Sequence, residues 1–242
     1  MIVGVIPAAG HATRLQPLGS SKEVRPIAGR PVMDYLVERL HRGGCDEVRV
    51  VTRPDKRDVI ENSRRHRAVV IEATPATLAA SLLAGIDGLD GRDVVAFGFP
   101  DSIWEPADGF RRLVELVEAG AGLALGLFRT ANVERPDVAE VTGSEPDLAV
   151  TRIDVGSDAP PPNLIWGCAV ARAAVLNRLR DWDDPGDLFS ALCREGPVAG
   201  AVLSSSYFDV GTPRGMRIAL AAARARPSPG RADSGFRASG LE

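Results

Sequence analysis

Short apolar runs alternate with segments of helical period along most of this chain, and this alternation constrains the fold more than any other feature. Runs of strand length lie at residues 1–6, 48–52, 68–71, 93–99 and 123–128. Segments with apolar residues at helical spacing lie between them, at 31–42, from about 55, at 77–86 and at 107–119. Such an order predicts parallel strands joined by crossover helices. We therefore expect the α/β class, with a Rossmann-like, doubly wound, mostly parallel sheet and helices on both faces.

The pattern changes between residues 131 and 162, where short alternating pieces at 138–141 and 149–153 are separated by Gly, Ser, Asp and Pro. We expect a small antiparallel insertion here, on the substrate side. The alternation then resumes with a strand at 164–171, helices at 173–182 and 187–194, a strand at 198–203 and a helix at 212–224. Residues 225–242 lack an apolar period and should be disordered. The sequence thus predicts one domain over residues 1–224, followed by a tail.

Composition excludes several classes of protein. The formal net charge of −3 gives no global field that would attract nucleic acid or anionic lipid. Three cysteines, Cys45, Cys168 and Cys193, are too few for a disulfide framework and lack the paired spacing of a zinc site. The chain starts without a basic leader, and its first apolar run stops at Pro7. We expect a cytoplasmic protein that binds neither nucleic acid nor membrane, and we interpret the basic stretch at 56–67 as a solvated helix face.

A loop of small residues follows the first expected strand, which is where open α/β sheets bind ligands. It contains Ala8, Ala9, Gly10, His11, Ala12 and Thr13. Small side chains let backbone N–H groups approach a phosphate closely. Arg14 offers a fork for bidentate phosphate contact, and Lys22 offers a compact charge. Taken alone, however, a structural turn is the better interpretation of such a loop.

Two aspartates follow strand-like segments. Asp101 comes after the run at 93–99, and Asp209 stands in the turn Asp-Val-Gly-Thr-Pro before the last expected helix. Mg²⁺ typically takes one or two protein carboxylates together with phosphate oxygens and water, so these two would suffice. Each also has a simpler interpretation, because Asp101 could make a turn and Asp209 could cap the helix.

The opening motif resembles that of the sugar nucleotidyltransferases, the glucose 1-phosphate thymidylyltransferase and uridylyltransferase group. The matching residues are Ala8, Ala9, Gly10, Thr13, Arg14, Leu15, Pro17, Lys22, Pro26, Gly29 and Pro31. The turn that begins at Asp209 matches a second family motif, so the resemblance spans residues 2–224. It implies the nucleotide-diphospho-sugar transferase fold and a reaction that joins a nucleoside triphosphate to a sugar 1-phosphate and releases pyrophosphate.

The resemblance also implies roles for individual residues. Arg14 would bind the departing pyrophosphate, Lys22 the α-phosphate, and Asp101 with Asp209 the catalytic Mg²⁺. The loop residues 8–13 would bind the nucleotide together with Glu72 and Thr77, and the sugar phosphate would be bound by Asp154, Asn163 and Gly167. The expected partners are therefore a nucleoside triphosphate and a sugar 1-phosphate. The sequence leaves the oligomeric state open, a homo-oligomer included.

Several positions depart from the family pattern. Ala12 replaces the second glycine of the loop, and the spacing from Arg14 to Lys22 is two residues shorter than usual. Glu72 stands where the thymidylyltransferases carry glutamine, and Thr77 where they carry glycine. An ionised carboxylate can only accept hydrogen bonds, so Glu72 would favour a base with two donors, such as guanine.

The largest departure is at Gly156, which occupies the place of the family's sugar-phosphate lysine. Three explanations are open: another cation such as Arg129 or Arg152 substitutes, the acceptor is unusual, or activity is lost. The second function class is therefore a catalytically weak nucleotide- or sugar-nucleotide-binding regulatory protein. Cytidylyl or molybdopterin-type transfer on a related fold is a weaker third, because the turn at Asp209 points to sugars.

Overall fold

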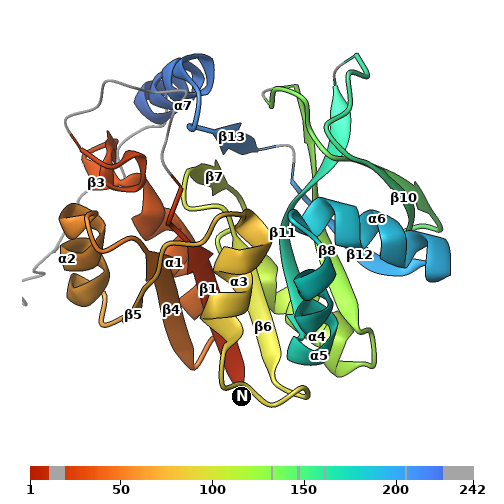
Figure 1. The fold of residues 1–242 in the computed structure, drawn as a ribbon. Helices are drawn as coiled ribbons and strands as arrows, with labels where there is room; N and C mark the ends of the chain where they lie inside the picture. Colours follow the sequence, from red (N-terminus) through yellow and green to blue (C-terminus); the bar gives the residue numbers. More distant parts are fainter. Residues whose placement is uncertain (11–19, 132, 146–147, 161, 205, 226–242) are drawn as a thin grey trace, which may run out of the picture.

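The computed structural model describes residues 1–10, 20–131, 133–145, 148–160, 162–204 and 206–225. Its centre is a nine-stranded mixed sheet in the order β5-β4-β1-β6-β11-β8-β12-β10-β9 (Figure 1). All of these strands run in one direction except β11 and β10. The bounds are β1 (Ile2–Pro7), β4 (Glu47–Thr52), β5 (Val69–Glu72), β6 (Val94–Gly98), β8 (Leu123–Thr130), β9 (Val138–Thr142), β10 (Leu148–Asp154), β11 (Asn163–Arg172) and β12 (Val198–Ser204).

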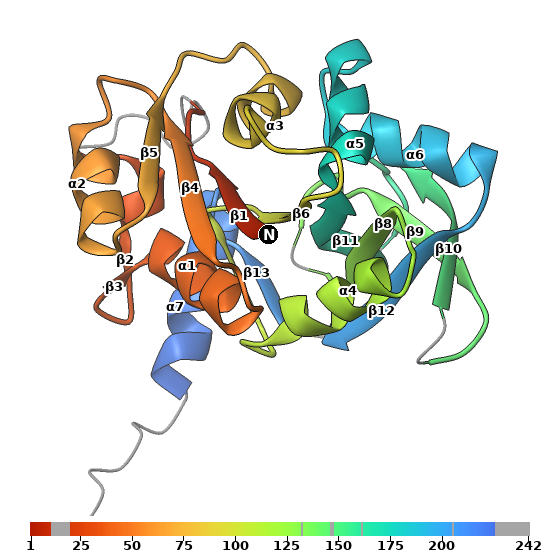
Figure 2. The ribbon, with the colours of Figure 1, turned by 90° about the horizontal axis from the view of Figure 1, so that it is seen from below.

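Helices cover both faces of the sheet, as Figure 2 shows from below. One face carries α3 (Leu78–Ile86), α5 (Ala173–Leu176), the 3₁₀ segment η3 (Asn177–Asp181) and α6 (Pro185–Glu195). The other face carries α1 (Val32–Arg42) and α4 (Gly109–Glu118), with α2 (Arg57–Arg65) beside them. Successive side chains of a strand point to opposite faces, so Val5 packs in the first core and Ile6 in the second. The expected doubly wound, mostly parallel sheet is confirmed.

Two details differ from the sequence expectation. The single helix expected at 173–182 is α5 followed by the 3₁₀ segment η3. The short antiparallel pieces expected within 131–162 are β9 and β10, and they extend the main sheet beyond β12. None of the described helices has the length and apolar character needed to cross a membrane. The tail expected to be disordered lies outside the described residues except for Ala225, which ends α7 (Pro213–Ala225).

Short elements that the sequence did not reveal build the surroundings of the carboxyl ends of β1 and β6. The 3₁₀ turn η2 (Lys22–Val24) and the small strands β2 (Pro26–Ile27) and β3 (Arg30–Pro31) precede α1. A two-stranded ribbon joins β7 (Ser102–Trp104), which follows β6, to β13 (Tyr207–Asp209), which precedes α7. In this ribbon Asp209 pairs with Ser102. The register therefore brings Asp209 beside Asp101.

Candidate active site

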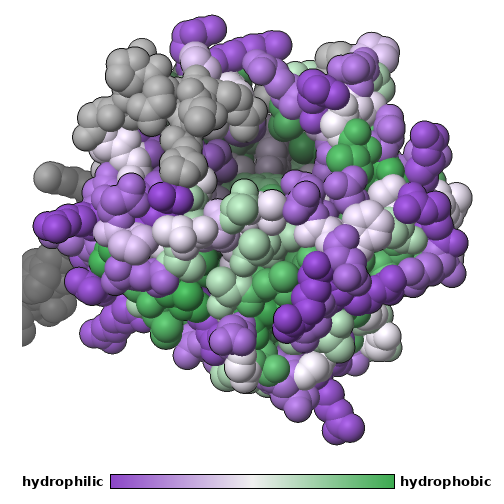
Figure 3. All heavy atoms as spheres, in the orientation of Figure 1, coloured by the Kyte–Doolittle hydropathy of each residue, from purple (hydrophilic) through white to green (hydrophobic). Residues whose placement is uncertain are grey.

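A cleft of about 670 Å³ opens at the carboxyl ends of β1 and β6. The space-filling view shows the molecule hollowed on this face, between α7 and the hairpin of β9 and β10 (Figure 3). One wall comes from the N-terminal half and the ribbon, with Ala9, Gly10, Lys22, Asp101 and Asp209. The opposite wall contains residues 133–137, Trp166 and Asp184, and the start of α3 closes one side with residues 75–78 and Ser81.

The two aspartates expected to bind metal meet at Gly211. A Cβ atom built on Gly211 would lie 2.5 Å from Asp101 Oδ2 and 2.9 Å from Asp209 Oδ1. The backbone supports this arrangement, because the Val210 N–H donates to the Asp101 carbonyl at 2.8 Å and the Gly211 N–H donates to Asp209 Oδ1 at 2.8 Å. A side chain at this position would therefore have to displace the two carboxylates.

Lys22 reaches the same point from the other end of the chain. Its Nζ donates to Asp101 Oδ2 at 2.5 Å. Burial alone would lower the pKa of Lys22, but the charge of Asp101 and the hydrogen bond to it outweigh burial. Glu23 and Asp209 add to this effect, so the pKa is raised and the amine stays protonated. Three of the four groups expected to surround a polyphosphate thus converge, while Arg14 lies outside the described residues.

Lys56 holds the turn that carries Lys22. Its Nζ donates to Glu23 Oε1 at 2.9 Å and to the carbonyl of Ala8 at 2.8 Å. Glu23 is fully buried, and its Oε2 has no hydrogen-bond partner among the described residues. Burial raises the pKa of Glu23, and the nearby charge of Lys56 offsets only part of that rise. The expectation that residues 56–67 form a solvated face is therefore wrong for Lys56, whose side chain is largely buried in an ion pair.

A second contact from α2 fixes the same turn on its other side. The N–H and the hydroxyl of Ser21 each donate to Asp58, at 2.7 Å. Burial would raise the pKa of Asp58, but these hydrogen bonds outweigh it and lower the pKa. The residues on both sides of Lys22 are thus bonded to α2 or to its N-cap residue Lys56, and these contacts fix the turn from which the Lys22 side chain extends.

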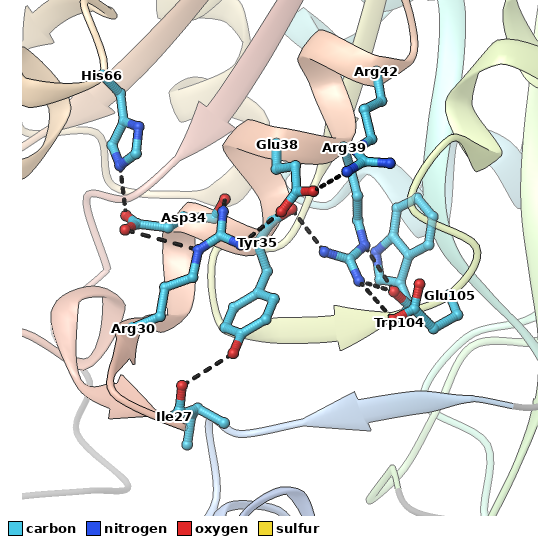
Figure 4. Close-up of polar contacts among 10 residues, drawn as sticks. All are labelled: Ile27, Arg30, Asp34, Tyr35, Glu38, Arg39, Arg42, His66, Trp104 and Glu105. Carbon is cyan, nitrogen blue, oxygen red and sulfur yellow. Dashed lines mark hydrogen bonds and ion pairs between the residues drawn. The ribbon is translucent and has the colours of Figure 1, made fainter. Parts of the chain in front are cut away.

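Arg39 of α1 fixes the strand that follows Asp101. The guanidinium is almost completely buried, and its Nε donates to the Trp104 carbonyl at 2.7 Å while Nη1 donates to the Tyr35 carbonyl at 2.8 Å. Figure 4 shows this side chain beside the Trp104 ring, with Glu105 next to it. Because Trp104 ends β7, Arg39 holds the ribbon in which Asp101 and Asp209 meet.

The opposite wall is built around Asp137. Its Oδ1 accepts from the Gly156 N–H at 2.9 Å, and its Oδ2 accepts from the Trp166 indole N–H at 3.0 Å. Asp184 caps α6 by accepting from the Gly186 N–H at 2.8 Å. Burial raises the pKa of both carboxyls. Neighbouring negative charge raises each pKa further, from Asp187 and Asp154 for Asp137 and from Asp137 and Asp187 for Asp184. This wall therefore combines an indole ring with two carboxylates that can accept hydrogen bonds from hydroxyl groups.

Some of the residues that the sequence analysis singled out line the cleft, and others do not. Those that line the cleft are Ala9, Gly10, Lys22, Thr77, Asp101 and Asp209. Thr77 also caps α3, where its hydroxyl accepts from the Ala80 N–H at 3.1 Å. Ala8 is buried beside the cleft and binds Lys56 through its carbonyl. His11, Ala12, Thr13 and Arg14 lie outside the described residues.

Four expected binding residues are not among the described residues that line the cleft. Glu72 is exposed at the end of β5, and Asp154 is exposed at the end of β10. The amide of Asn163 donates to the Ala159 carbonyl at 3.2 Å. Gly167 packs against Tyr207, whose ring would lie 2.4 Å from a Cβ atom at that position. Its small size therefore makes room for β13.

Sequence reasoning missed four residues that shape the site, namely Glu23, Lys56, Asp137 and Asp184. Local signals existed for two of them, because Glu23 directly follows Lys22 and Asp184 stands before Pro185 as the N-cap of α6. Lys56 and Asp137 act through contacts that cross between elements. Pattern within one segment does not reveal such contacts.

The donor set at Gly211 fits Mg²⁺. Hard cations prefer carboxylate oxygens, and Mg²⁺ keeps several waters or phosphate oxygens besides one or two carboxylates. Asp101 Oδ2 and Asp209 Oδ1 lie on either side of one small residue in the cleft. A third protein ligand is not needed for this mode of binding.

Comparison with known proteins agrees with this geometry. The family model for the MobA-like NTP transferase domain matches residues 4–188. The low-salt glycan biosynthesis nucleotidyltransferase Agl11 of Haloferax volcanii is 26% identical over 231 residues, which cover 87% of this chain and 62% of that protein. The bifunctional protein GlmU of Symbiobacterium thermophilum is 30% identical over 247 residues, covering 93% of this chain and 50% of GlmU.

A solved structure shares the fold. The UTP-bound UGPase from Acinetobacter baumannii superimposes with a TM-score of 0.73 at 19% identity, covering 92% of this chain and 93% of that one. The chain spans only about half to two thirds of the length of Agl11 and the Symbiobacterium GlmU. Together with the cleft and its converging Lys22, Asp101 and Asp209, the match over residues 4–188 shows that this chain belongs to the MobA-like NTP transferase family.

Proposed function

We propose that this nucleotidyltransferase uses a sugar or sugar-like 1-phosphate as acceptor, and that it forms a nucleoside diphosphate sugar and pyrophosphate. The observation that carries the proposal is the meeting of Lys22, Asp101 and Asp209 in one cleft, beside Ala9 and Gly10 at the end of β1. The indole of Trp166 and the carboxylate of Asp184 in the opposite wall suit the apolar face and the hydroxyls of a sugar ring. The likeness to Agl11 over most of this chain supports the same class of reaction.

The reaction needs no protein nucleophile. A phosphate oxygen of the acceptor attacks the α-phosphorus in line, the bond to the β-phosphate oxygen breaks, and pyrophosphate leaves. Lys22 would neutralise charge on the α-phosphate, since its amine is protonated and held in the cleft. Arg14 would bind the departing pyrophosphate. Catalysis in this class of reaction is mostly positioning and stabilisation of charge.

Asp101 and Asp209 would hold Mg²⁺. When bound, the ion neutralises charge on the triphosphate and on the leaving group. In the structure the Asp101 carboxylate is paired with Lys22 at 2.5 Å.

A matrix of nucleoside triphosphates against sugar 1-phosphates, read out by pyrophosphate release, tests the proposal. We expect release with at least one pair and none from the triphosphate alone. The same matrix tests whether Glu72 selects the base, since a clear preference for dTTP or UTP contradicts the guanine hypothesis. Nucleotide binding by calorimetry without release for any pair would reject the proposed reaction and favour a binding protein.

A further inference from the structure

The cleft contains a cation that no motif identified. Among the described residues that line it, only Lys22 and Arg135 carry positive charge. The described acids there are Glu23, Asp101, Glu134, Asp137, Asp184 and Asp209. Lys22 forms an ion pair with Asp101 at 2.5 Å. A second phosphate-bearing substrate therefore needs another positive group, and Arg135 in the opposite wall is the described residue that can supply it.

The side chain of Arg135 is available for a ligand. It is 74% exposed, and its ion pair with Asp158 spans 3.5 Å between two groups in water, since Asp158 is 87% exposed. Exposed pairs of this kind contribute little and exchange readily for a better partner. A guanidinium presents a planar fork that suits the oxygens of a phosphate. An incoming phosphomonoester could thus replace Asp158 without breaking a buried contact.

The backbone around Arg135 is held more firmly than its side chain. The Ser157 N–H donates to the Pro136 carbonyl at 2.8 Å, and the Gly156 N–H donates to Asp137 at 2.9 Å. Arg135 itself has a φ of 49°, a left-handed conformation that non-glycine residues rarely adopt. Such strained residues cluster at ligand sites, where surrounding contacts maintain them. These bonds clasp residues 135–137 to residues 156–157.

The clasp also places the guanidinium beside Gly156. Arg135 Nη2 donates to the Gly156 carbonyl at 3.3 Å and lies 3.7 Å from where a Cβ of residue 156 would be. The space next to residue 156 is therefore occupied by a cation from another segment. The sequence analysis considered Arg129 and Arg152 as replacements for the missing lysine. Neither is among the described residues that line the cleft, and Arg152 pairs with Glu140 at 3.0 Å.

We propose that Arg135 binds the phosphate of the acceptor sugar 1-phosphate, in place of the lysine that the family pattern has at Gly156. This proposal rests on the proposed function, because it names the group that holds the acceptor of that reaction. Asp137 is a positioning residue for it, since Asp137 ties Gly156 and Trp166 to the segment that carries Arg135.

The test uses the full chain and the variants R135A, R135K, R152A and R178A. With the best substrate pair of the matrix, R135A should raise the KM for the sugar 1-phosphate about 10- to 100-fold, the range for loss of a charge-assisted hydrogen bond. Its KM for the triphosphate should stay within about twofold, since Lys22, Ala9 and Gly10 lie in the other wall. R135K should fall between R135A and wild type because it keeps the charge and loses the fork.

R178A is the matched control. Arg178 forms an exposed ion pair with Glu195 and is not among the described cleft residues, so its loss should leave both KM values unchanged. An unchanged acceptor KM in R135A overturns the proposal while the proposed function stands, and so does an equal rise in both KM values. A rise confined to R152A moves the role to Arg152 and overturns it as well.

Calorimetry separates failure of this proposal from failure of the proposed function. The sugar 1-phosphates of the matrix are titrated into wild type and R135A, with the corresponding free sugars as phosphate-free probes. If wild type binds a sugar 1-phosphate but catalyses no release, and R135A loses that binding, the proposed function fails and the Arg135 site stands. If wild type binds none of these phosphates, or binds the free sugar equally well, the Arg135 site is refuted.

Discussion

The buried pair of Lys56 and Glu23 gives a prediction about stability that can be worked from the structure. Lys56→Met keeps the length of the side chain and removes its charge. Two unit charges 2.9 Å apart attract by about 6 kcal/mol at an effective dielectric constant of about 20. Desolvation opposes part of this in the folded protein, and breaking one partner of a buried pair typically costs about 3–5 kcal/mol. The Ala8 carbonyl loses a donor as well.

We therefore expect Lys56→Met to lower the free energy of unfolding by about 3–5 kcal/mol. In a chain of this length such a loss lowers Tm by about 6–20 °C. Urea denaturation followed by circular dichroism measures the free energy, and calorimetry measures Tm. The m-value should stay constant, which shows that the same folded state is compared.

The way in which the loss of stability in Lys56→Met depends on pH tests whether the Glu23 carboxylate causes it. Burial already raises the pKa of Glu23, and removing Lys56 raises it further. An acid whose pKa is raised in the folded state contributes stability below its unfolded pKa of about 4.3 and loses it as pH rises. The difference between wild type and Lys56→Met should therefore be small near pH 4 and largest above pH 7, measured as urea midpoints across that range.

Two further variants test whether an unpaired buried charge explains the loss of stability. The double variant E23L/K56M replaces both charges with apolar groups and should recover at least half of the loss, since no buried charge is left unpaired. Arg53→Met removes a nearby pair whose partner Asp55 is exposed and should change stability by less than about 1 kcal/mol. The argument fails if Lys56→Met costs no more than Arg53→Met, or if the double variant is less stable than Lys56→Met.

Three further predictions concern the cleft. Asp101→Asn should reduce kcat at least about 100-fold with the fold intact by circular dichroism, because it removes a proposed Mg²⁺ ligand and a metal contributes several kcal/mol. An unchanged rate would remove the metal assignment. Gly211→Ala places a methyl group 2.5 Å from Asp101 Oδ2 and should lose most turnover, whereas Gly196→Ala, where nothing lies within 4 Å, should be silent in the same assay. Equal activity of these two would contradict the close approach of the carboxylates. Asp184→Asn keeps the helix cap and removes a carboxyl whose pKa is raised by burial and by Asp137. Because ionisation of that carboxyl costs stability as pH rises, the Tm of this variant minus the Tm of wild type should increase from pH 4 to pH 7. A Tm difference that does not change with pH would argue against a raised pKa of Asp184.

The sheet could be predicted because its strands carry their signal locally. Residues 2–7 and 94–98 are apolar runs that end at turn residues, and each became a buried strand within one or two residues of its expected bounds. The helices on the two faces have apolar residues at helical spacing, which is an equally local signal. In contrast, β7 and β13 have three residues each, too few for an alternating pattern to show, and the partner of each lies in a distant segment. They exist because they pair with each other.

The candidate site was predictable to the extent that single residues mark it. Lys22, Asp101 and Asp209 stand in recognisable motifs, and the structure brings these three side chains together. Lys56 looked like one charge among several on a polar helix, and only the fold shows that it meets Glu23. The clasp that carries Arg135 likewise depends on hydrogen bonds between the ends of the β9–β10 hairpin, which lie far apart along the chain.

The pairing of β13 with β7 makes synthesis of residues 207–209 a condition for bringing Asp209 beside Asp101. During synthesis the segment that contains Lys22 and Asp101 leaves the ribosome long before residues 207–209 are made, and no earlier described strand pairs with β7. A nascent or prematurely terminated polypeptide can therefore form the strands around β1 without the second carboxylate that we propose for Mg²⁺. We expect such fragments to be inert toward triphosphates, so that incomplete molecules do not consume nucleotide in the cell.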